Sequence, residues 1–213
     1  MIRVLVTNTK GGCGKTTVAT NLAVAFASGG LATALADVDR QKSSLDWLAA
    51  RPGTASPIRP LDWRKDAGDV PAGVQRLVID CPAALRMGEV DDLIREADLV
   101  VVPVLPSIFD EGSTRRFVER LEELKPVRKG KKPVALVANR LRARSRAVQR
   151  LDGFLAEIGQ PVAARLSDLA LYGELAAQGL GLFDLDGPKF RPARAEWQPL
   201  LRAIEGVAAP GQR

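Results

Sequence analysis

The sequence contains no histidine and only two cysteines, Cys13 and Cys81. Without histidine, the protein has neither a histidine general base nor a histidine-ligated metal. Two cysteines are too few for a disulfide framework, so we expect a reducing compartment. Aromatic residues make up 5% of the chain. There is no run of about 18 apolar residues, so no transmembrane helix is expected. Residues 1–8 carry one charge and lead directly into a motif, so no cleavable signal is expected either.

The composition is that of a soluble globular protein. The chain has 213 residues, of which 46% are hydrophobic and 26% charged. That size can bury a substantial core, and no low-complexity linker or repeat divides it, so we predict a single domain over residues 1–213. The net charge is +6 and the isoelectric point about 9.7. This positive balance is compatible with a polyanionic partner, without identifying one.

Apolar segments that predict strands alternate with longer segments that predict helices. Strands are expected at 2–8, 32–38, 76–80, 99–105 and 133–138, with one short strand near 58–61. Helices are expected at 16–28, 43–50, 90–97, 112–124 and 143–158. Strands alternating with helices predict βαβ units. The expected fold is therefore α/β: a mostly parallel, twisted sheet flanked by helices, as in P-loop NTPases.

A glycine-rich loop lies between the first predicted strand and the first predicted helix. Residues 10–17 read Lys-Gly-Gly-Cys-Gly-Lys-Thr-Thr. In such a loop, backbone N–H groups and the helix N-terminus surround phosphate oxygens. Lys15 is expected to reach the β- and γ-phosphates of ATP, and the Thr16 hydroxyl to bind Mg²⁺. A glycine-rich turn without a ligand is disfavoured, because strand, glycines, lysine, hydroxyl and helix all agree. The predicted ATP-binding residues here are Gly11, Gly12, Cys13, Gly14, Lys15, Thr16 and Thr17.

Three carboxylates follow two predicted strands. Asp37 and Asp39 end one strand, and Asp80 ends the next clear one. Ligands of α/β sheets gather at the carboxyl ends of strands, so all three are expected to face the loop. Thr16 would be the direct Mg²⁺ ligand, with Asp37 or Asp80 orienting metal-bound waters. Asp39 would position or deprotonate the attacking water, or alternatively anchor the N-terminus of the following helix.

Together these segments resemble the ParA/MinD family of deviant Walker ATPases. The resemblance lies in residues 10–17, 37–41 and 79–82, and further in 102–107 and 137–140. The length resembles the compact ParA forms that lack an N-terminal DNA-binding domain. One departure from the family pattern is Arg40, which stands where proline is usual. That departure concerns the turn beside Asp39.

The resemblance implies an ATPase that works as a homodimer. Two subunits would sandwich two ATP molecules, with Lys10 crossing to the phosphates bound by the other subunit. Lys10, Lys15 and Asp39 would be the catalytic residues, and Asn139 would contact the adenine. A lysine that acts only across the interface couples nucleotide binding to dimerisation. Hydrolysis would be slow until a partner, a ParB-like protein or another small adaptor, completes the site.

Basic residues concentrate in one part of the sequence. Residues 125–151 contain ten basic side chains and no acidic one, whereas the rest of the chain carries 21 basic and 25 acidic residues. This stretch predicts non-specific DNA binding through phosphate contacts. A solvated face without a partner is the alternative, and Arg140 and Arg142 could instead serve the nucleotide, because they follow Asn139. The predicted DNA-binding residues are Arg142, Arg144, Arg146 and Arg150.

Several functions compete on this evidence. The first is a cytoplasmic ATPase, nucleoid-associated when ATP-bound, that positions a plasmid, a chromosome or a protein assembly. A MinD-like membrane ATPase is disfavoured, because residues 204–213 lack the large apolar side chains of an amphipathic anchor. An iron protein would need cluster cysteines away from the loop, and there are none. A P-loop enzyme with a small-molecule acceptor remains an alternative, against which only Lys10 argues.

Overall fold

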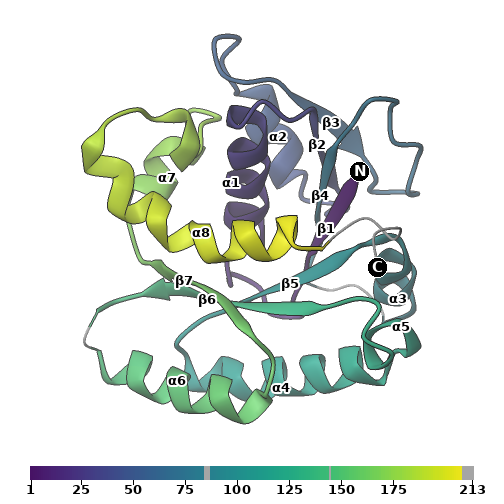
Figure 1. Ribbon diagram of the computed structural model, residues 1–213, viewed down its shortest axis with the longest axis vertical. Coiled ribbons are helices and arrows are strands. Elements are labelled where there is room, and N and C mark those ends of the chain that lie inside the picture. Colours follow the sequence, from purple (N-terminus) through teal and green to yellow (C-terminus); the bar gives the residue numbers. More distant parts are fainter. Residues whose placement is uncertain (84–86, 144, 208–213) are drawn as a thin grey trace.

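The computed structural model describes residues 1–83, 87–143 and 145–207, which form a sheet with helices on both faces (Figure 1). Seven strands lie in the order β3-β2-β4-β1-β5-β6-β7, and every neighbouring pair is parallel. The predicted α/β fold is confirmed. The strands are β1 Ile2–Val6, β2 Thr33–Asp37, β3 Ile58–Asp62, β4 Arg76–Asp80, β5 Leu99–Val104, β6 Val134–Leu141 and β7 Val162–Ser167.

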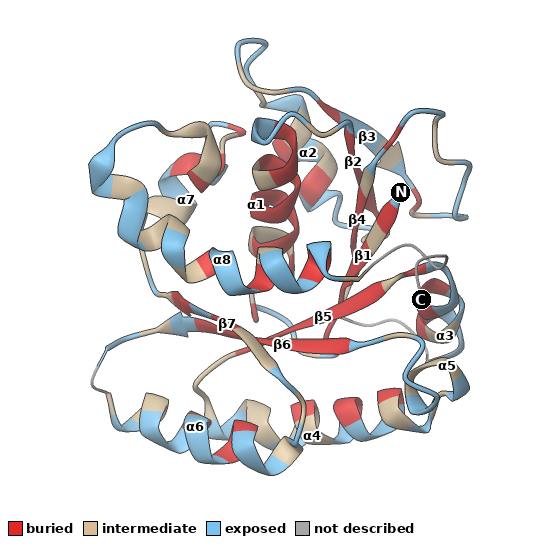
Figure 2. Cartoon of the chain, in the orientation of Figure 1, coloured by how far each residue is buried: buried red, intermediate tan, exposed pale blue. Residues whose placement is uncertain are grey.

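The helices cover the sheet in two layers. On one face lie α1, α7 and α8, and on the other lie α3, α4 and α6 (Figure 1). Strands β2 and β5 are buried along their whole length, and β1 and β4 are buried except at Arg3 and Arg76, because apolar side chains alternate between these layers (Figure 2). The helices are α1 Lys15–Ser28, α2 Ser43–Ala49, α3 Met87–Glu96, α4 Ile108–Glu123, α5 Lys125–Arg128, α6 Arg146–Ile158, α7 Leu171–Ala176 and α8 Arg191–Glu205.

Two parts of the secondary structure differ from the sequence prediction. Helix α4 begins at Ile108, four residues before the predicted start, which brings Asp110 into its first turn. The sequence analysis also made no prediction for α5, β7, α7 and α8. Helix α8 buries one narrow face, Trp197, Leu200 and Ile204 at i, i+3 and i+7, but it contains Pro199, which argues against a helix interior. Tertiary packing of that narrow face against β7 and α1 stabilises the helix despite the proline.

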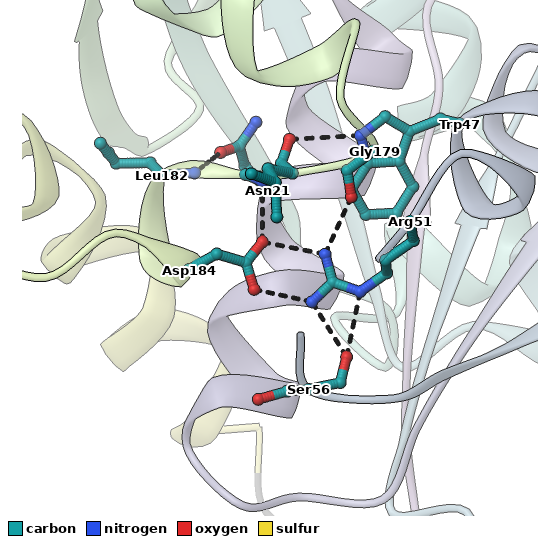
Figure 3. Close-up of polar contacts among 9 residues, drawn as sticks. Asn21, Trp47, Arg51, Ser56, Gly179, Leu182 and Asp184 are labelled. Atoms are coloured by element: carbon teal, nitrogen blue, oxygen red, sulfur yellow. Dashed lines mark hydrogen bonds and ion pairs between the residues drawn. The ribbon is translucent and has the colours of Figure 1, made fainter. Parts of the chain in front are cut away.

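A buried polar network ties the chain after α7 to α2 (Figure 3). The Arg51 guanidinium donates to both carboxylate oxygens of Asp184 at 2.9 and 2.7 Å, and to the carbonyls of Ser56 and Gly179. Both charged side chains are 6% exposed. Asn21 Oδ1 on α1 accepts a hydrogen bond from the Leu182 amide at 2.8 Å, and Asn21 Nδ2 donates one to the Thr17 carbonyl at 2.9 Å. The segment after α7 is thereby fixed to the helix that carries the glycine-rich loop.

Candidate functional site

The strand order brings the sequence-predicted site residues together. Strand β4 lies between β1 and β2, so that Asp80 pairs with Val6 on one side and with Asp37 on the other. The glycine-rich loop leaves β1 directly after this point and leads into α1. The loop, Asp37 and Asp80 therefore meet at the carboxyl edge of the sheet, as predicted.

Glycine is required in the loop itself. Gly14 has φ 89°, and a Cβ there would lie 2.2 Å from Asn139 Nδ2. Asn139 is buried, and its Nδ2 donates to the Cys13 carbonyl at 2.8 Å. The end of β6 thus braces the loop from the side. The Asn139 amide nitrogen is engaged with the loop, while the predicted contact of this residue with adenine stays a prediction.

The two lysines of the loop point to different partners. Lys15 is buried, and its Nζ donates to the Lys10 carbonyl at 2.8 Å, within the curve of the loop. The side chain of Lys10 is 33% exposed, and its Nζ lies 3.0 Å from Asp110 Oδ1 on α4. Lys15 thus lies within its own loop, whereas Lys10 reaches α4, and the binding of phosphate by either lysine stays a prediction. The sequence did not reveal Asp110, because the predicted helix began after it.

Asp80 supplies a carboxylate oxygen that fits a metal site. Burial raises the pKa of Asp80 to about 6, against the opposing effect of the Ser44 and Thr16 hydroxyls. Ser44 Oγ donates to one carboxylate oxygen, and the other is buried without a hydrogen-bond partner among the described residues. A buried oxygen of this kind, beside the Thr16 hydroxyl, suits a Mg²⁺ held mostly by water and phosphate. Within the described ranges, no group of three or more side chains forms an all-protein metal site.

Asp37 instead anchors α2. Its Oδ2 accepts the amides of Ser44 and Leu45 at 2.9 and 3.1 Å, and its Oδ1 accepts the Asp39 amide at 2.8 Å. Burial raises the pKa of Asp37, and these three amides oppose the rise. The anchoring role weighed for Asp39 thus belongs to Asp37. Of the two carboxylates predicted to orient metal-bound water, Asp80 is the one with an oxygen that has no hydrogen-bond partner among the described residues.

Asp39 begins the exposed turn that leads into α2. Its Oδ1 accepts the Gln41 amide at 3.0 Å, and its carbonyl accepts the Lys42 amide at 3.0 Å. Lys42 has φ 59°, a conformation that costs energy in a residue with a side chain. Arg40 is exposed within this turn, so the turn forms without the proline usual in the resembled family. Asp39 is half-buried beside the site, and its catalytic role stays a prediction.

The structure divides the basic stretch into two separate groups. One group lies on α5 and the turn after it. The other follows β6 and runs into α6, at the loop edge of the sheet. Arg142 pairs with Asp168 and Arg150 with Glu111, both at 2.9 Å. Arg146 is exposed at the start of α6, and Arg144 lies outside the described residues.

The fold and this loop define a P-loop nucleotide-binding protein, and comparison with known proteins gives the family. Residues 4–182 match the model of the CobQ/CobB/MinD/ParA nucleotide binding domain. The chain is 29% identical over 206 residues to maintenance of carboxysome distribution protein A of Halothiobacillus neapolitanus, covering 93% of this chain and 94% of that protein.

Solved structures of similar fold agree with this match. The MinD cell division protein of Aquifex aeolicus superimposes with a TM-score of 0.74 at 18% identity, covering both chains completely (100%). A protein described as a plasmid partition protein from Borrelia burgdorferi, bound to AMPPNP, gives 0.75 at 15% identity, covering 95% of this chain and 99% of that one. The chain belongs to the CobQ/CobB/MinD/ParA family of nucleotide-binding domains. It is an ATPase of the ParA/MinD type, with ATP and Mg²⁺ as its nucleotide and metal.

Proposed function

We propose that this ParA-type ATPase positions a cargo by dimerising on ATP and binding DNA without sequence preference. The observation that carries the proposal is that Lys10 pairs with Asp110 on α4, outside the curve of the loop, while Lys15 lies within it. A lysine held outside its own phosphate site by a partly exposed ion pair could exchange Asp110 for phosphates bound by a second subunit. Its charge would then stabilise phosphate only in the dimer, which links association to the nucleotide.

The reaction is hydrolysis of ATP to ADP and phosphate. Lys15 binds the β- and γ-phosphates, Lys10 of the other subunit adds positive charge, and Asp39 orients or deprotonates the water. Thr16 would hold Mg²⁺ directly and Asp80 would hold it through water, and the bound metal would supply positive charge against the phosphates. The exposed turn around Asp39 leaves the water position open, so hydrolysis is slow until a partner orders it.

The proposed DNA-binding surface lies at the loop edge of the sheet. Arg142, Arg146 and Arg150 follow β6 or lie on α6 and are exposed, and Arg144 belongs to the same segment of the sequence. Two subunits meeting over ATP would bring two such surfaces together, which strengthens phosphate binding. The protein would thus bind the nucleoid strongly in its ATP state and lose that strong binding after hydrolysis.

For the cargo we propose a protein assembly of the carboxysome type, together with a small adaptor that stimulates hydrolysis. The support is the match over nearly the whole chain to a carboxysome distribution protein. Plasmids and chromosomes are the other cargoes of this mechanism. In the described part of the chain, no helix is long and apolar enough to cross a membrane.

The experiment measures mass in solution and binding to random-sequence duplex DNA, each with ATP, with ADP and without nucleotide. With ATP we expect a dimer whose DNA binding is weakened by salt. Its DNA affinity should exceed any affinity measured without ATP. Lys15→Ala should lose ATP binding, and Lys10→Ala should keep ATP but stay monomeric. A wild-type protein that binds ATP, stays monomeric and gains no DNA affinity would contradict the proposal. A P-loop enzyme with a small-molecule acceptor would then be the better account.

A further inference from the structure

A second cluster of cations lies far from the ATP site, on α5 and the turn that follows it. We call this cluster the α5 patch. Three of its side chains belong to α5 or its cap, and two follow Gly130. All are exposed or half-buried, and no acidic residue interrupts them in the sequence. The α5 patch consists of Lys125, Arg128, Lys129, Lys131 and Lys132.

Backbone hydrogen bonds fold the α5 patch onto itself. Gly130 has φ 65° and reverses the chain at the end of the helix. The amides of Lys131 and Lys132 then both donate to the Pro126 carbonyl, at 3.0 and 3.2 Å. Cations from both ends of the segment are thereby gathered on one short platform. A platform fixed in this way loses little conformational entropy when it binds.

The platform is also anchored to the body of the protein. Leu124 and Val127 pack against the core cluster beneath α4 and α6. The Lys132 ammonium donates to the Ala97 carbonyl, just before β5. In the part of the chain that the structure describes, the other four cations of the patch make no ion pair. Their charge is therefore available to an outside partner.

The α5 patch and the loop-edge arginines lie at opposite ends of the strands. The patch directly precedes β6, whose eight residues span about 25 Å, and Arg142 follows that strand. Figure 1 shows α5 and α6 at different ends of the lower helical layer. The sequence joins these cations in one stretch, but one rigid strand separates them. The α5 patch therefore stays accessible whether or not two subunits meet over ATP.

The chemistry of the patch favours phosphate groups over other partners. Among the described residues, the large hydrophobic side chains that are exposed are Met1, Ile108 and Phe109, none of them in the patch. A protein interface needs an apolar centre, and a membrane-inserting helix needs bulky apolar residues. Duplex DNA offers closely spaced phosphates that four or five fixed cations can contact without any apolar surface.

We infer that the α5 patch is a second DNA contact, one that works without nucleotide. This inference rests on the proposed function only because it takes DNA as the partner. The contact itself needs neither ATP nor dimerisation. The loop-edge surface would give the strong, ATP-dependent binding of the dimer. The α5 patch would give weak binding in every state, which keeps the ADP-bound or free monomer near the DNA.

The test measures binding to random-sequence duplex DNA without nucleotide and with ATP, at two salt concentrations. Its central variant is Lys129→Glu with Lys131→Glu. Arg59→Glu with Lys65→Glu is the matched control, because both residues are exposed and the charge change is equal. We expect nucleotide-free wild-type binding that salt weakens. The patch variant should lower the nucleotide-free DNA affinity about tenfold and reduce the slope of log affinity against log salt by about 2. The control variant should change this affinity little.

The outcomes separate this inference from the proposed function. DNA binding without nucleotide that is lost in the patch variant supports the inference. If ATP then adds no further DNA binding, that result contradicts the proposed function but not the inference. Arg142→Glu with Arg146→Glu should remove the ATP-dependent increase in DNA binding. The inference is overturned if the wild type binds DNA only with ATP, or if the control pair weakens binding equally. Patch-dependent binding to phosphatidylserine vesicles, with none to DNA, would overturn it as well.

Discussion

The ammonium of Lys10 lies 3.0 Å from the carboxylate of Asp110, which belongs to the first turn of α4. The Asp110 side chain is 16% exposed and the Lys10 side chain 33%, so the pair sits at the mouth of the loop rather than deep inside it. Lys10 cannot keep this partner and also reach across to another subunit. The pair therefore competes with the proposed dimer for the same ammonium group.

Replacing Asp110 by asparagine should make dimerisation easier. A partly exposed ion pair contributes up to about 1 kcal/mol, so its loss should lower the dimer dissociation constant with ATP about two- to fivefold. Sedimentation across a protein concentration series measures this constant. The control is Asp91→Asn, which removes an exposed pair with Arg95 on α3. An Asp110→Asn protein that dimerises less readily than wild type would show that the pair supports the dimer instead.

The buried Asp80 should make stability depend on pH. Its pKa is about 6 in the folded protein, against about 3.9 for an unperturbed aspartate, so the folded state holds the proton more tightly. The stability gained from that proton is fully present below about pH 4 and is lost as the pH rises through about 6. We expect Asp80→Asn to raise Tm at pH 8 by about 5 °C and to change it little at pH 4.

That comparison requires protein without Mg²⁺ or nucleotide, because a metal would stabilise the ionised carboxylate. Thermal unfolding by circular dichroism at both pH values is sufficient. Asp66→Asn, at an exposed position, is the control and should leave both Tm values unchanged. The same Asp80→Asn protein should lose most of its Mg²⁺-dependent ATP hydrolysis. An equal Tm change at both pH values would mean that the charge of Asp80 is not its cause.

Gly14→Ala should weaken ATP binding more than it weakens the fold. The added Cβ would lie 2.2 Å from Asn139 Nδ2, and φ 89° is unfavourable for alanine. Both effects displace the loop from Asn139 and from phosphate. We expect at least a tenfold loss of ATP affinity by calorimetry, about 1.4 kcal/mol. Gly30→Ala is the control, because its φ is 83° with open space around it, away from the loop. It should lower stability by about 1 kcal/mol and leave ATP affinity unchanged.

The Arg51–Asp184 pair should contribute strongly to stability when one partner alone is removed. Both side chains are buried, so Asp184→Ala leaves the guanidinium without its carboxylate (Figure 3). We expect a loss of about 3–5 kcal/mol in the free energy of unfolding, measured by urea denaturation. Arg64→Ala, which removes the exposed pair with Asp62, should cost far less, because water screens that pair. Equal losses in the two variants would contradict the importance of burial.

Local sequence patterns were sufficient for the central fold and the phosphate loop. Continuous apolar runs such as 99–105 predicted buried strands, because burial on both faces requires apolar side chains at every position. The loop at 10–17 carries its phosphate chemistry within eight consecutive residues. Helix Arg191–Glu205 was not predicted, because Pro199 argues against a helix interior, although Trp197, Leu200 and Ile204 recur at helical spacing. That helix depends on packing against β7 and α1, which no local window contains.

By itself, the sequence determined the class of protein, the phosphate loop and the set of candidate carboxylates. Only the tertiary structure distinguished Asp37, which anchors α2, from Asp80, whose buried oxygen has no partner among the described residues. It also paired Lys10 with Asp110 and divided the basic stretch between the two ends of β6. The physical reason is that parallel strands joined by helices place residues many positions apart side by side. A side chain's partner is therefore set by strand order and packing, whereas its chemical type is set by the sequence.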